Sequence, residues 1–328
     1  MCTSPGHPDI KSVCIVERSS VLGERQNFLK GNLRIRGHAL LAFVKRLTAD
    51  QSFVLLVPAV VLLLIFFAYP LIQLMKMSVF DPNFTTAHFE KFFSRPVYPR
   101  VLFNTVKLTA IVTLLCFIIG YPAAYFLATV RSRIRPFLIF LILLPLWVSI
   151  LVRSYSWMAV LGREGLINSL LIALGVTTEP IPMLYTTGAV YVAMVQIMLP
   201  IMILTSYSVM VEIDNGLIKA ARVLGASPFR AFLFVYFPLS LSGARNGSII
   251  IFILSMGFFI TPALVGGRKD LMIGNLIVFQ IEELLNWGFA SAIGLILLVS
   301  TVLIVLMLRF ILDAATPGAP KRRSKEPV

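Results

Sequence analysis

The residue types that carry catalysis or bind metal ions are few in this sequence, and their spacing matches no recognised site. The Gly-Gly-Arg-Lys-Asp stretch at 266–270 lacks the spacing of a phosphate-binding loop, so any ATP hydrolysis would have to occur on another chain. The histidines and cysteines form no metal-ligand or nucleophile motif and no paired cysteine spacing: His7, His38, His88, Cys2, Cys14 and Cys116. We therefore expect no catalytic residue, no cofactor and no metal site. An integral membrane enzyme remains a less favoured alternative.

Two basic residues, Lys107 and Arg153, lie close to long apolar runs of the sequence. Ionisable side chains at membrane depth are candidates for function. Both residues fall near run ends that we place outside, so snorkelling or pairing with acids of the outer loops is the simpler explanation. A proton-coupled carrier would place Asp, Glu or His in the middle of a span, and we find none there. An ion- or proton-coupled secondary transporter is therefore the weaker alternative.

The composition identifies the class of protein that must position these residues. Hydrophobic residues make up 58% of the chain and charged residues only 13%, a balance that no soluble domain needs. Six runs contain no Asp, Glu, Lys or Arg: 51–75, 108–130, 136–152, 180–211, 246–267 and 284–308. A bilayer core takes about 20 apolar residues per helix, and the runs lack the alternation of a β-barrel. The sequence predicts an all-α polytopic membrane protein with six transmembrane helices.

The expected domain organisation follows from these runs. A cytoplasmic arm, 1–52, contains an interfacial helix at 33–47, for which a flexible basic lead-in is the alternative. The six-span transmembrane domain covers 53–311, with a structured inner segment at 212–242, and a basic cytoplasmic tail follows at 312–328. The expected spans are about 53–75, 105–130, 136–158, 185–210, 244–265 and 287–311. Pro145, Pro200 and Pro262 each interrupt a span.

The net charge of +14 could suggest nucleic acid as a partner, but the distribution of the basic residues indicates orientation in a membrane. Lys and Arg gather in 1–52, in 131–135, in 212–245 and after residue 308. These segments share one side if the spans alternate. Because cytoplasmic loops collect Lys and Arg, we expect both termini inside, a multi-pass protein in the lipid bilayer, and no nucleic-acid partner.

The inner segment between the fourth and fifth spans shows the pattern of two short helices. Asp214 or Asn215 can cap the first helix, and Gly225 suits the left-handed position that closes it. Its apolar face combines positions i, i+3, i+4 and i+7: Leu217, Ala220, Ala221 and Leu224. Small alanines on that face permit the close approach of a partner.

The second helix is expected to start at Ser227, with Pro228 in its first turn. Its apolar face repeats the same spacing: Phe229, Phe232, Leu233 and Tyr236. Pro238 marks the exit into the fifth span. Helices this short need a packing partner. The residues alone favour neither of two partners, the protein's own helix ends or a soluble protein that binds the corner.

The segment resembles the "EAA" loop of inner-membrane permease subunits of binding-protein-dependent ABC importers. That loop reads Glu-Ala-Ala, three residues, Gly, nine residues, then Ile-x-Leu-Pro, and this chain has Lys219-Ala220-Ala221, Gly225 and Val235-Tyr236-Phe237-Pro238 at the same spacing. The departure is Lys219, where the family usually has Glu. The resemblance implies a type I importer fold and alternating access. It implies that Lys219, Ala220, Ala221, Gly225, Ser227, Pro228, Phe232 and Pro238 form a coupling element that docks on cytoplasmic ATP-binding subunits.

Longer stretches, including 144–171, 237–267 and 271–294, look like those of spermidine/putrescine-type permeases, whose pattern is shared by systems for other small charged solutes. The resemblance implies a bacterial inner-membrane location, a second and different permease subunit, and an extracytoplasmic solute-binding protein. A polyamine would favour aromatic faces, so a candidate pathway consists of Trp147, Tyr155, Trp157, Gln196, Phe259 and Thr261. Packing or interfacial anchoring is the more frequent role of such aromatics.

Overall fold

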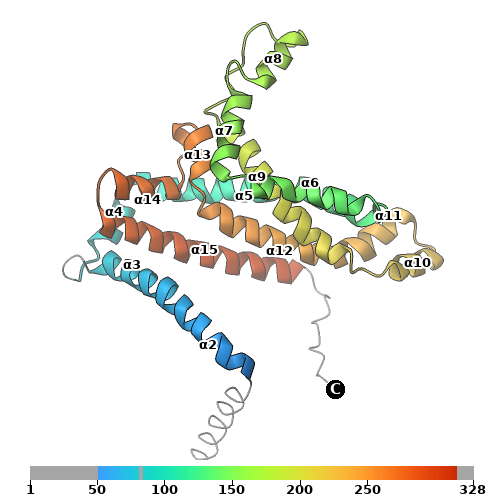
Figure 1. Ribbon diagram of the computed structural model, residues 1–328, viewed down its shortest axis with the longest axis horizontal. Coiled ribbons are helices and arrows are strands. Elements are labelled where there is room, and N and C mark those ends of the chain that lie inside the picture. The colour runs from blue at the N-terminus through green and yellow to red at the C-terminus, as the bar shows by residue number, and fades with distance from the viewer. Residues whose placement is uncertain (1–50, 81–83, 316–328) are drawn as a thin grey trace, which may run out of the picture. The chain divides into compact units, whose positions relative to one another are not determined.

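The computed structural model describes residues 51–80 and 84–315 (Figure 1). The predicted interfacial helix at 33–47, most of the arm and nearly all of the tail lie outside these residues. Within them the regular secondary structure is helical, apart from one isolated bridge between Phe80 and Phe84. The predicted all-α class is confirmed. Five helices are long and apolar enough to cross a membrane, or six if one bent helix pair counts as a single span.

The first described segment forms one apolar helical stretch. It consists of α2 (Gln51–Leu63), the π-helical turn η1 (Leu64–Ala68) and α3 (Tyr69–Val79). Its residues Leu56–Val79 suffice for a membrane span. In the π turn the backbone N–H of Tyr69 bonds the carbonyl of Leu64, immediately before Pro70, which has no N–H to donate. The chain therefore passes a proline without ending the helix.

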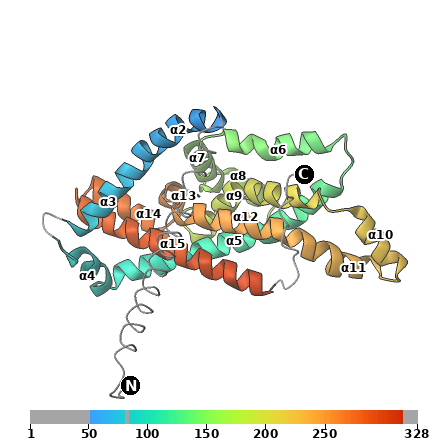
Figure 2. The same ribbon diagram turned by 90° about the horizontal axis from the view of Figure 1, so that it is seen from below.

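Three long helices form the centre of the bundle: α5 (Val97–Thr129), α9 (Thr187–Met210) and α12 (Phe237–Met256). They pack against one another around a shared apolar cluster that includes Val112, Met194 and Ile251. Figures 1 and 2 show α15 (Trp287–Ala315) running alongside α12. The pieces α10 (Asn215–Val223) and α11 (Pro228–Ala231) project at one end of the bundle, which we call the corner end.

Glycines allow the central helices to approach closely. A Cβ atom added at Gly120 of α5 would lie 2.6 Å from Met202 of α9. On α12, a Cβ at Gly243 would lie 2.8 Å from the Thr205 carbonyl, and one at Gly247 would collide with the Thr205 hydroxyl. Small residues four positions apart let membrane helices pack backbone to backbone. The α9–α12 contact depends on this pair of glycines.

The predicted third span, 136–158, is not one straight helix. It consists of α6 (Arg135–Trp147) and α7 (Ile150–Leu161), separated at Val148 and Ser149, and the segment that α7 opens is bent by 95° from α6. Pro145 lies two residues before the end of α6, so the helix does end near a proline. Figure 1 shows α7 and α8 (Leu166–Ala173) turning away from the long helices.

The other two prolines behave differently from the prediction. Pro200 lies inside α9, which continues through it as one helix of 24 residues, so the expectation that it interrupts the span is wrong. Pro262 belongs to the short α13 (Ile260–Val265), after a break at 257–259. The helix that contains the start of the predicted fifth span, 244–265, therefore ends at Met256. Gly257 is the C-cap residue of α12.

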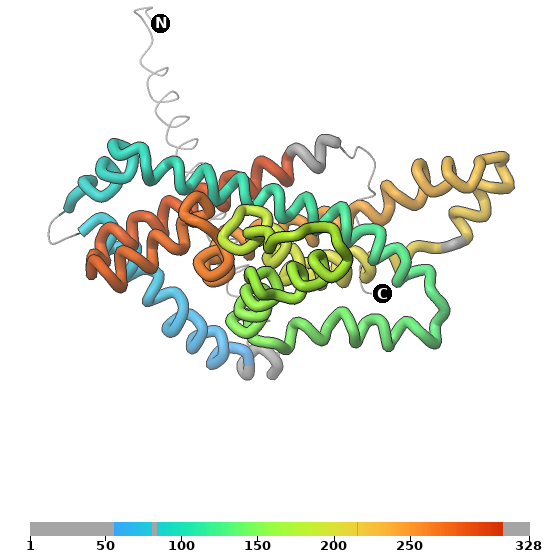
Figure 3. Tube along the Cα trace, turned by 90° about the horizontal axis from the view of Figure 1, so that it is seen from above, coloured from blue at the N-terminus to red at the C-terminus, as the bar shows by residue number. Residues whose placement is uncertain are grey.

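The end opposite the corner is closed by short elements (Figure 3): α4 (Ala87–Ser94), the 3-10 turn η3 (Arg268–Asp270) and α14 (Ile273–Glu282). The first turns of α5 hold them. Thr105 accepts a hydrogen bond from the Ile273 amide at 2.9 Å, and Asn104 donates to the carbonyl of Lys269 at 2.9 Å. Asp270 accepts from Thr187 at 2.6 Å and so ties η3 to the start of α9.

Candidate functional site

The first corner helix, α10, begins and ends as local signals predict. Asp214 accepts a hydrogen bond from the Gly216 amide at 2.7 Å and caps the helix. At the other end Gly225 has φ +89°. Its amide bonds the Arg222 carbonyl at 3.0 Å, and the Ala226 amide bonds the Ala221 carbonyl at 3.1 Å. These two bonds and the left-handed glycine form a Schellman motif.

The second corner helix is part of a longer helix than the sequence predicts. Ser227 accepts from the Arg230 amide at 3.3 Å, and Pro228 occupies the first turn, as expected. Instead of ending at Pro238, the chain passes through a π-helical turn, η2 (Phe232–Tyr236), directly into α12. Residues Pro228–Met256 therefore form one helix. The prediction that Pro238 marks an exit from the corner helix is wrong, because the helix continues through it.

The π turn explains how Pro238 is tolerated. The Phe237 amide bonds the Phe232 carbonyl five residues back, so the turn is one residue wider than an α-turn just before the proline. Pro70 stands at the same distance after η1. A proline in an α-helix clashes with the carbonyl four residues earlier, and the wider turn relieves that clash.

Much of the predicted apolar surface of the corner is uncovered. Leu217 and Ala220 of α10 are exposed, and Val223 and Leu224 each keep 88% of their accessible surface. In the second helix Phe229 is 71% exposed. Ala221 is half-buried, while Lys219, Ser227, Pro228 and Pro238 are exposed. The described part of the chain covers one side of α10, through the half-buried Ile218, and leaves the Leu217–Leu224 side open.

The predicted apolar face of the second helix divides into two. Tyr236 is buried and Phe232 half-buried, and their rings stack at 5.7 Å between centroids. Both meet Tyr125 near the end of α5 edge-on, at 5.3 Å from Phe232 and 5.2 Å from Tyr236. Phe229 and Leu233 are exposed instead.

These ring contacts join the corner to a central helix of the bundle. Sequence reasoning missed Tyr125, and it also missed the exposed Phe234, which is 73% accessible. The aromatic pair at positions 232 and 236 was the available signal. No local rule identifies its partner on a helix about a hundred residues earlier.

The structure brings together only some of the candidate pathway residues. Trp157 of α7 donates from its indole nitrogen to Gln196 of α9 at 3.4 Å. Thr261 is fully buried, and its hydroxyl lies 2.8 Å from that of Ser154. These two contacts join α7 to α9 and to α13.

The remaining three candidates make other contacts. Trp147 is 77% exposed and meets Phe140 of its own helix edge-on at 6.1 Å. Tyr155 is exposed, and the Phe259 carbonyl accepts from Asn275 of α14 at 2.9 Å. None of these contacts joins the three residues to the Trp157–Gln196 pair.

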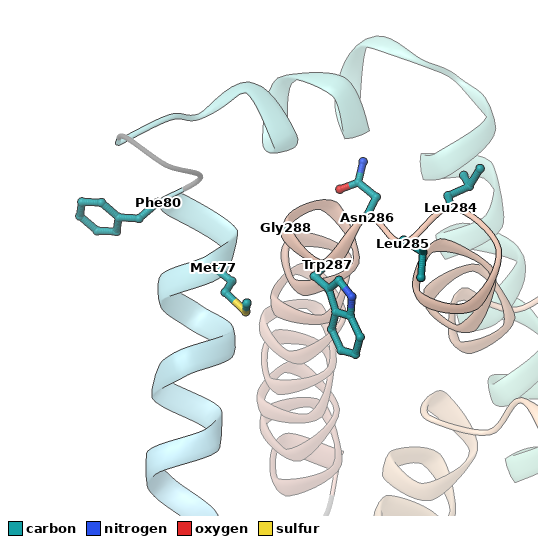
Figure 4. A pocket seen from close by; sticks show the side chains of 7 residues that line it. All are labelled: Met77, Phe80, Leu284, Leu285, Asn286, Trp287 and Gly288. Carbon is teal, nitrogen blue, oxygen red and sulfur yellow. The ribbon is translucent and has the colours of Figure 1, made fainter.

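A separate pocket of about 500 Å³ lies near the end of α3 (Figure 4). It is lined by residues of α3 and of the α14–α15 turn: Met77, Phe80, Leu284, Leu285, Asn286, Trp287 and Gly288. No predicted site residue lines it. Asn286 is already engaged there. Its side-chain oxygen accepts a hydrogen bond from the Phe289 amide at 3.0 Å, and its backbone N–H donates to the Gln280 carbonyl at 2.8 Å.

Residues 116–317, from the middle of α5 to beyond the end of α15, match the family described as the binding-protein-dependent transport system inner membrane component. The chain belongs to this family. The matched region contains the corner, the central helices and the bent pair, so the permease assignment covers the described site. It is the permease subunit of an ABC importer and not an enzyme, and ATPase activity resides in a partner subunit.

Individual relatives agree with this assignment. The permease is 38% identical over 210 residues to the spermidine/putrescine transport system permease protein PotB of Haemophilus influenzae, covering 64% of this chain and 73% of PotB. It is 37% identical over 213 residues to PotB of Escherichia coli K12, covering 65% of this chain and 76% of PotB. As an inner-membrane, multi-pass permease of this family, it works with an ATP-binding subunit and a substrate-binding protein.

A solved structure shows the same fold. A chain of a bacterial alginate ABC transporter, crystallised with an alginate-bound periplasmic protein, superposes with a TM-score of 0.68 at 18% identity. The superposition covers 84% of this permease and 98% of that chain. The predicted importer-permease architecture is confirmed.

Proposed function

We propose that this permease moves polyamines of the spermidine/putrescine class into the cell by alternating access. The support is the 37–38% identity to PotB proteins of two organisms, over about two thirds of the chain. The candidate pathway is compatible with such a solute, because aromatic faces attract ammonium groups. The Trp157–Gln196 contact joins an indole ring and a neutral amide between two packed helices.

We further propose that the corner is the coupling element. The observation that carries this proposal is the exposed apolar surface of α10 and of the Schellman turn that closes this helix. Val223 and Leu224 there are each 88% accessible. Exposed apolar residues that gather on one rigid projection mark an interaction site. The ATP-binding subunit is the partner that this proposal assigns to the surface. The rings of Phe232, Tyr236 and Tyr125 would pass its movement to α5.

This assignment places the corner end in the cytoplasm. The basic linker at 131–135 joins α5 to α6 near the same end, because Tyr125 touches the corner residues. Cytoplasmic loops collect Lys and Arg, which supports the same orientation and both termini inside. We also propose a second permease subunit, a different chain, as the partner in the membrane.

The experiment is uptake by the reconstituted importer. The permease, the second permease and the ATP-binding subunits would be placed in proteoliposomes with the binding protein. ATP-dependent uptake of labelled spermidine and putrescine would be compared with that of molybdate and an acidic oligosaccharide. We expect uptake of polyamines alone. Uptake of an anionic solute without polyamine uptake would contradict the proposed solute while leaving the permease role intact.

A further inference from the structure

Arg153 is a cationic side chain whose buried nitrogens have no acceptor. It lies in the first turn of α7, where its backbone amide bonds the Ser149 carbonyl. Its Nε and Nη1 atoms are buried, and the residues that the structure describes offer them neither a hydrogen bond nor an ion pair. Burying two nitrogens of a guanidinium without a partner is costly, even in a side chain that is only partly buried. The described residues therefore leave two nitrogens of this charged group without a partner.

The helices around Arg153 cannot supply the missing acceptor as a carboxylate. Helix α7 packs against α8, α9 and α13, and the sequences of these helices and of α6 contain no Asp or Glu. Asp270 is the acid next to the start of α9. Both of its oxygens are engaged, by the Thr187 hydroxyl at 2.6 Å and by the Gly267 amide at 3.0 Å.

The position of Arg153 along the bundle makes solvation by bulk water difficult. Helix α6 starts at Arg135, close to the corner end, and has 13 residues, so it is about 20 Å long. With the corner end in the cytoplasm, as proposed, we infer that Arg153, which follows the end of α6, lies within a hydrocarbon core of about 30 Å. Charged residues at such depth face a protein interior or a cavity, and they are paired.

The side chains next to Arg153 divide α7 into a held face and an open face. Ser154 and Trp157 bond Thr261 and Gln196, and so fix the helix against α13 and α9. Leu151, Val152 and Tyr155 are each about half exposed or more. The described part of the chain leaves these apolar neighbours uncovered, so a second protein can reach Arg153 along this face.

We propose that a carboxylate of the second permease subunit pairs with Arg153 and completes the pathway between the two subunits. The proposal rests on the proposed function, which supplies a second permease and a cationic solute. A polyamine cannot be the counter-ion of a guanidinium, whereas a carboxylate matches its planar donor fork. The pair would also neutralise a positive charge that would otherwise repel the solute.

The test is assembly of the complete importer with charge changes at Arg153. The variants are Arg153→Glu and Arg153→Gln, and the matched control is Lys107→Gln, an exposed cation on α5. Recovery of the second permease with the tagged permease in detergent is measured by quantitative blotting. We expect Arg153→Glu to reduce recovery about tenfold or more, with Lys107→Gln unchanged. We expect one Asp→Arg or Glu→Arg change in the second permease to restore it.

A second pair guards against a variant that fails to fold. Arg153→Gln combined with the amide variant of the identified acid removes both charges, and we expect it to assemble better than either single change because no buried charge is left alone. Normal recovery of Arg153→Glu and Arg153→Gln would overturn the proposal, and so would the absence of any rescuing acid. Assembly does not depend on the solute. A failure of polyamine uptake in a complex that shows the rescue would therefore contradict the proposed solute alone.

Discussion

The hydroxyl of Tyr121 on α5 lies 2.6 Å from the hydroxyl of Ser240 on α12, and both side chains are buried. Ser240 also donates to the Phe237 carbonyl one turn earlier, at 3.0 Å. Its proton is therefore engaged, and Tyr121 is the donor in the pair. The Tyr121 ring meets Phe237 edge-on at 5.4 Å. The bond fixes α5 against the first turns of α12, directly after the π turn that ends the corner.

This donor assignment predicts unequal effects for the two partners. Ser240→Ala leaves the Tyr121 hydroxyl buried without an acceptor and should destabilise the permease by about 1–3 kcal/mol. Tyr121→Phe removes the donor but leaves Ser240 bonded to Phe237, so we expect a smaller loss. Thermal unfolding of the purified permease in detergent measures both, together with the double variant. A larger loss for Tyr121→Phe would show that the donor assignment is wrong.

Gly225 should be more sensitive than a glycine of the same geometry elsewhere. Gly175 closes α8 with φ +70° and the same two bonds, Gly175 to Ile172 and Val176 to Leu171, each at 3.0 Å. An added Cβ would meet nothing within 4 Å at either glycine. Substitution by proline removes the amide donor and the left-handed conformation at both sites.

We expect Gly225→Pro to abolish ATP-driven uptake while leaving the protein in the membrane, because the corner loses its shape. Gly175→Pro is the matched control and should retain most uptake. ATP-dependent uptake in proteoliposomes, normalised to the amount of permease inserted, measures the difference. Equal losses for both variants would indicate a general folding defect and would remove the special role of Gly225.

Local rules account for much of the corner. The cap at Asp214, the left-handed Gly225 and the cap at Ser227 each depend on a few neighbouring residues, so the sequence predicts them correctly. The π turn at 232–236 accommodates Pro238, and neither a capping rule nor a proline rule predicts such a turn. Helix continuity through Pro238 was therefore not predictable.

The bent helix pair and the candidate pathway likewise combine features that neighbouring residues predict with features that depend on distant contacts. Pro145 indicates that a helix ends nearby, but the 95° bend follows from the contacts of α7 with α9 and α13. Trp157 and Gln196 were predicted as candidates from their chemistry alone. Their contact joins residues 39 positions apart, which no periodicity reveals.

Lys219 replaces the usual glutamate of the coupling loop and is exposed. We expect Lys219→Glu to be tolerated because an exposed charge contributes about 0–1 kcal/mol. Recovery of the ATP-binding subunit should then stay within about fivefold of the wild type, the factor that corresponds to 1 kcal/mol. Lys219→Ala serves as the control that removes the charge without reversing it. Loss of the subunit with Lys219→Glu but not with Lys219→Ala would reveal a matched acid on the partner.

The Trp157–Gln196 contact predicts an effect on transport rate without an effect on assembly. Trp157→Phe removes the indole donor, and uptake should fall by up to about tenfold if the pair lines the pathway. Trp147→Phe is the control, since Trp147 is exposed and meets Phe140. Maximal uptake rate and half-saturating concentration are measured separately. Unchanged uptake with Trp157→Phe would assign the pair to packing alone.

The exposed residue before each left-handed glycine gives the sharpest comparison for the coupling proposal. Leu224 precedes Gly225 and is 88% exposed, and Leu174 precedes Gly175 and is 75% exposed. A glutamate at either position stays at the surface and should leave the fold intact. Binding of the purified ATP-binding subunit to immobilised permease complexes carrying Leu224→Glu or Leu174→Glu tests the central claim directly. We predict that Leu224→Glu loses this binding and Leu174→Glu keeps it, whereas wild-type binding by Leu224→Glu would contradict the docking of the corner.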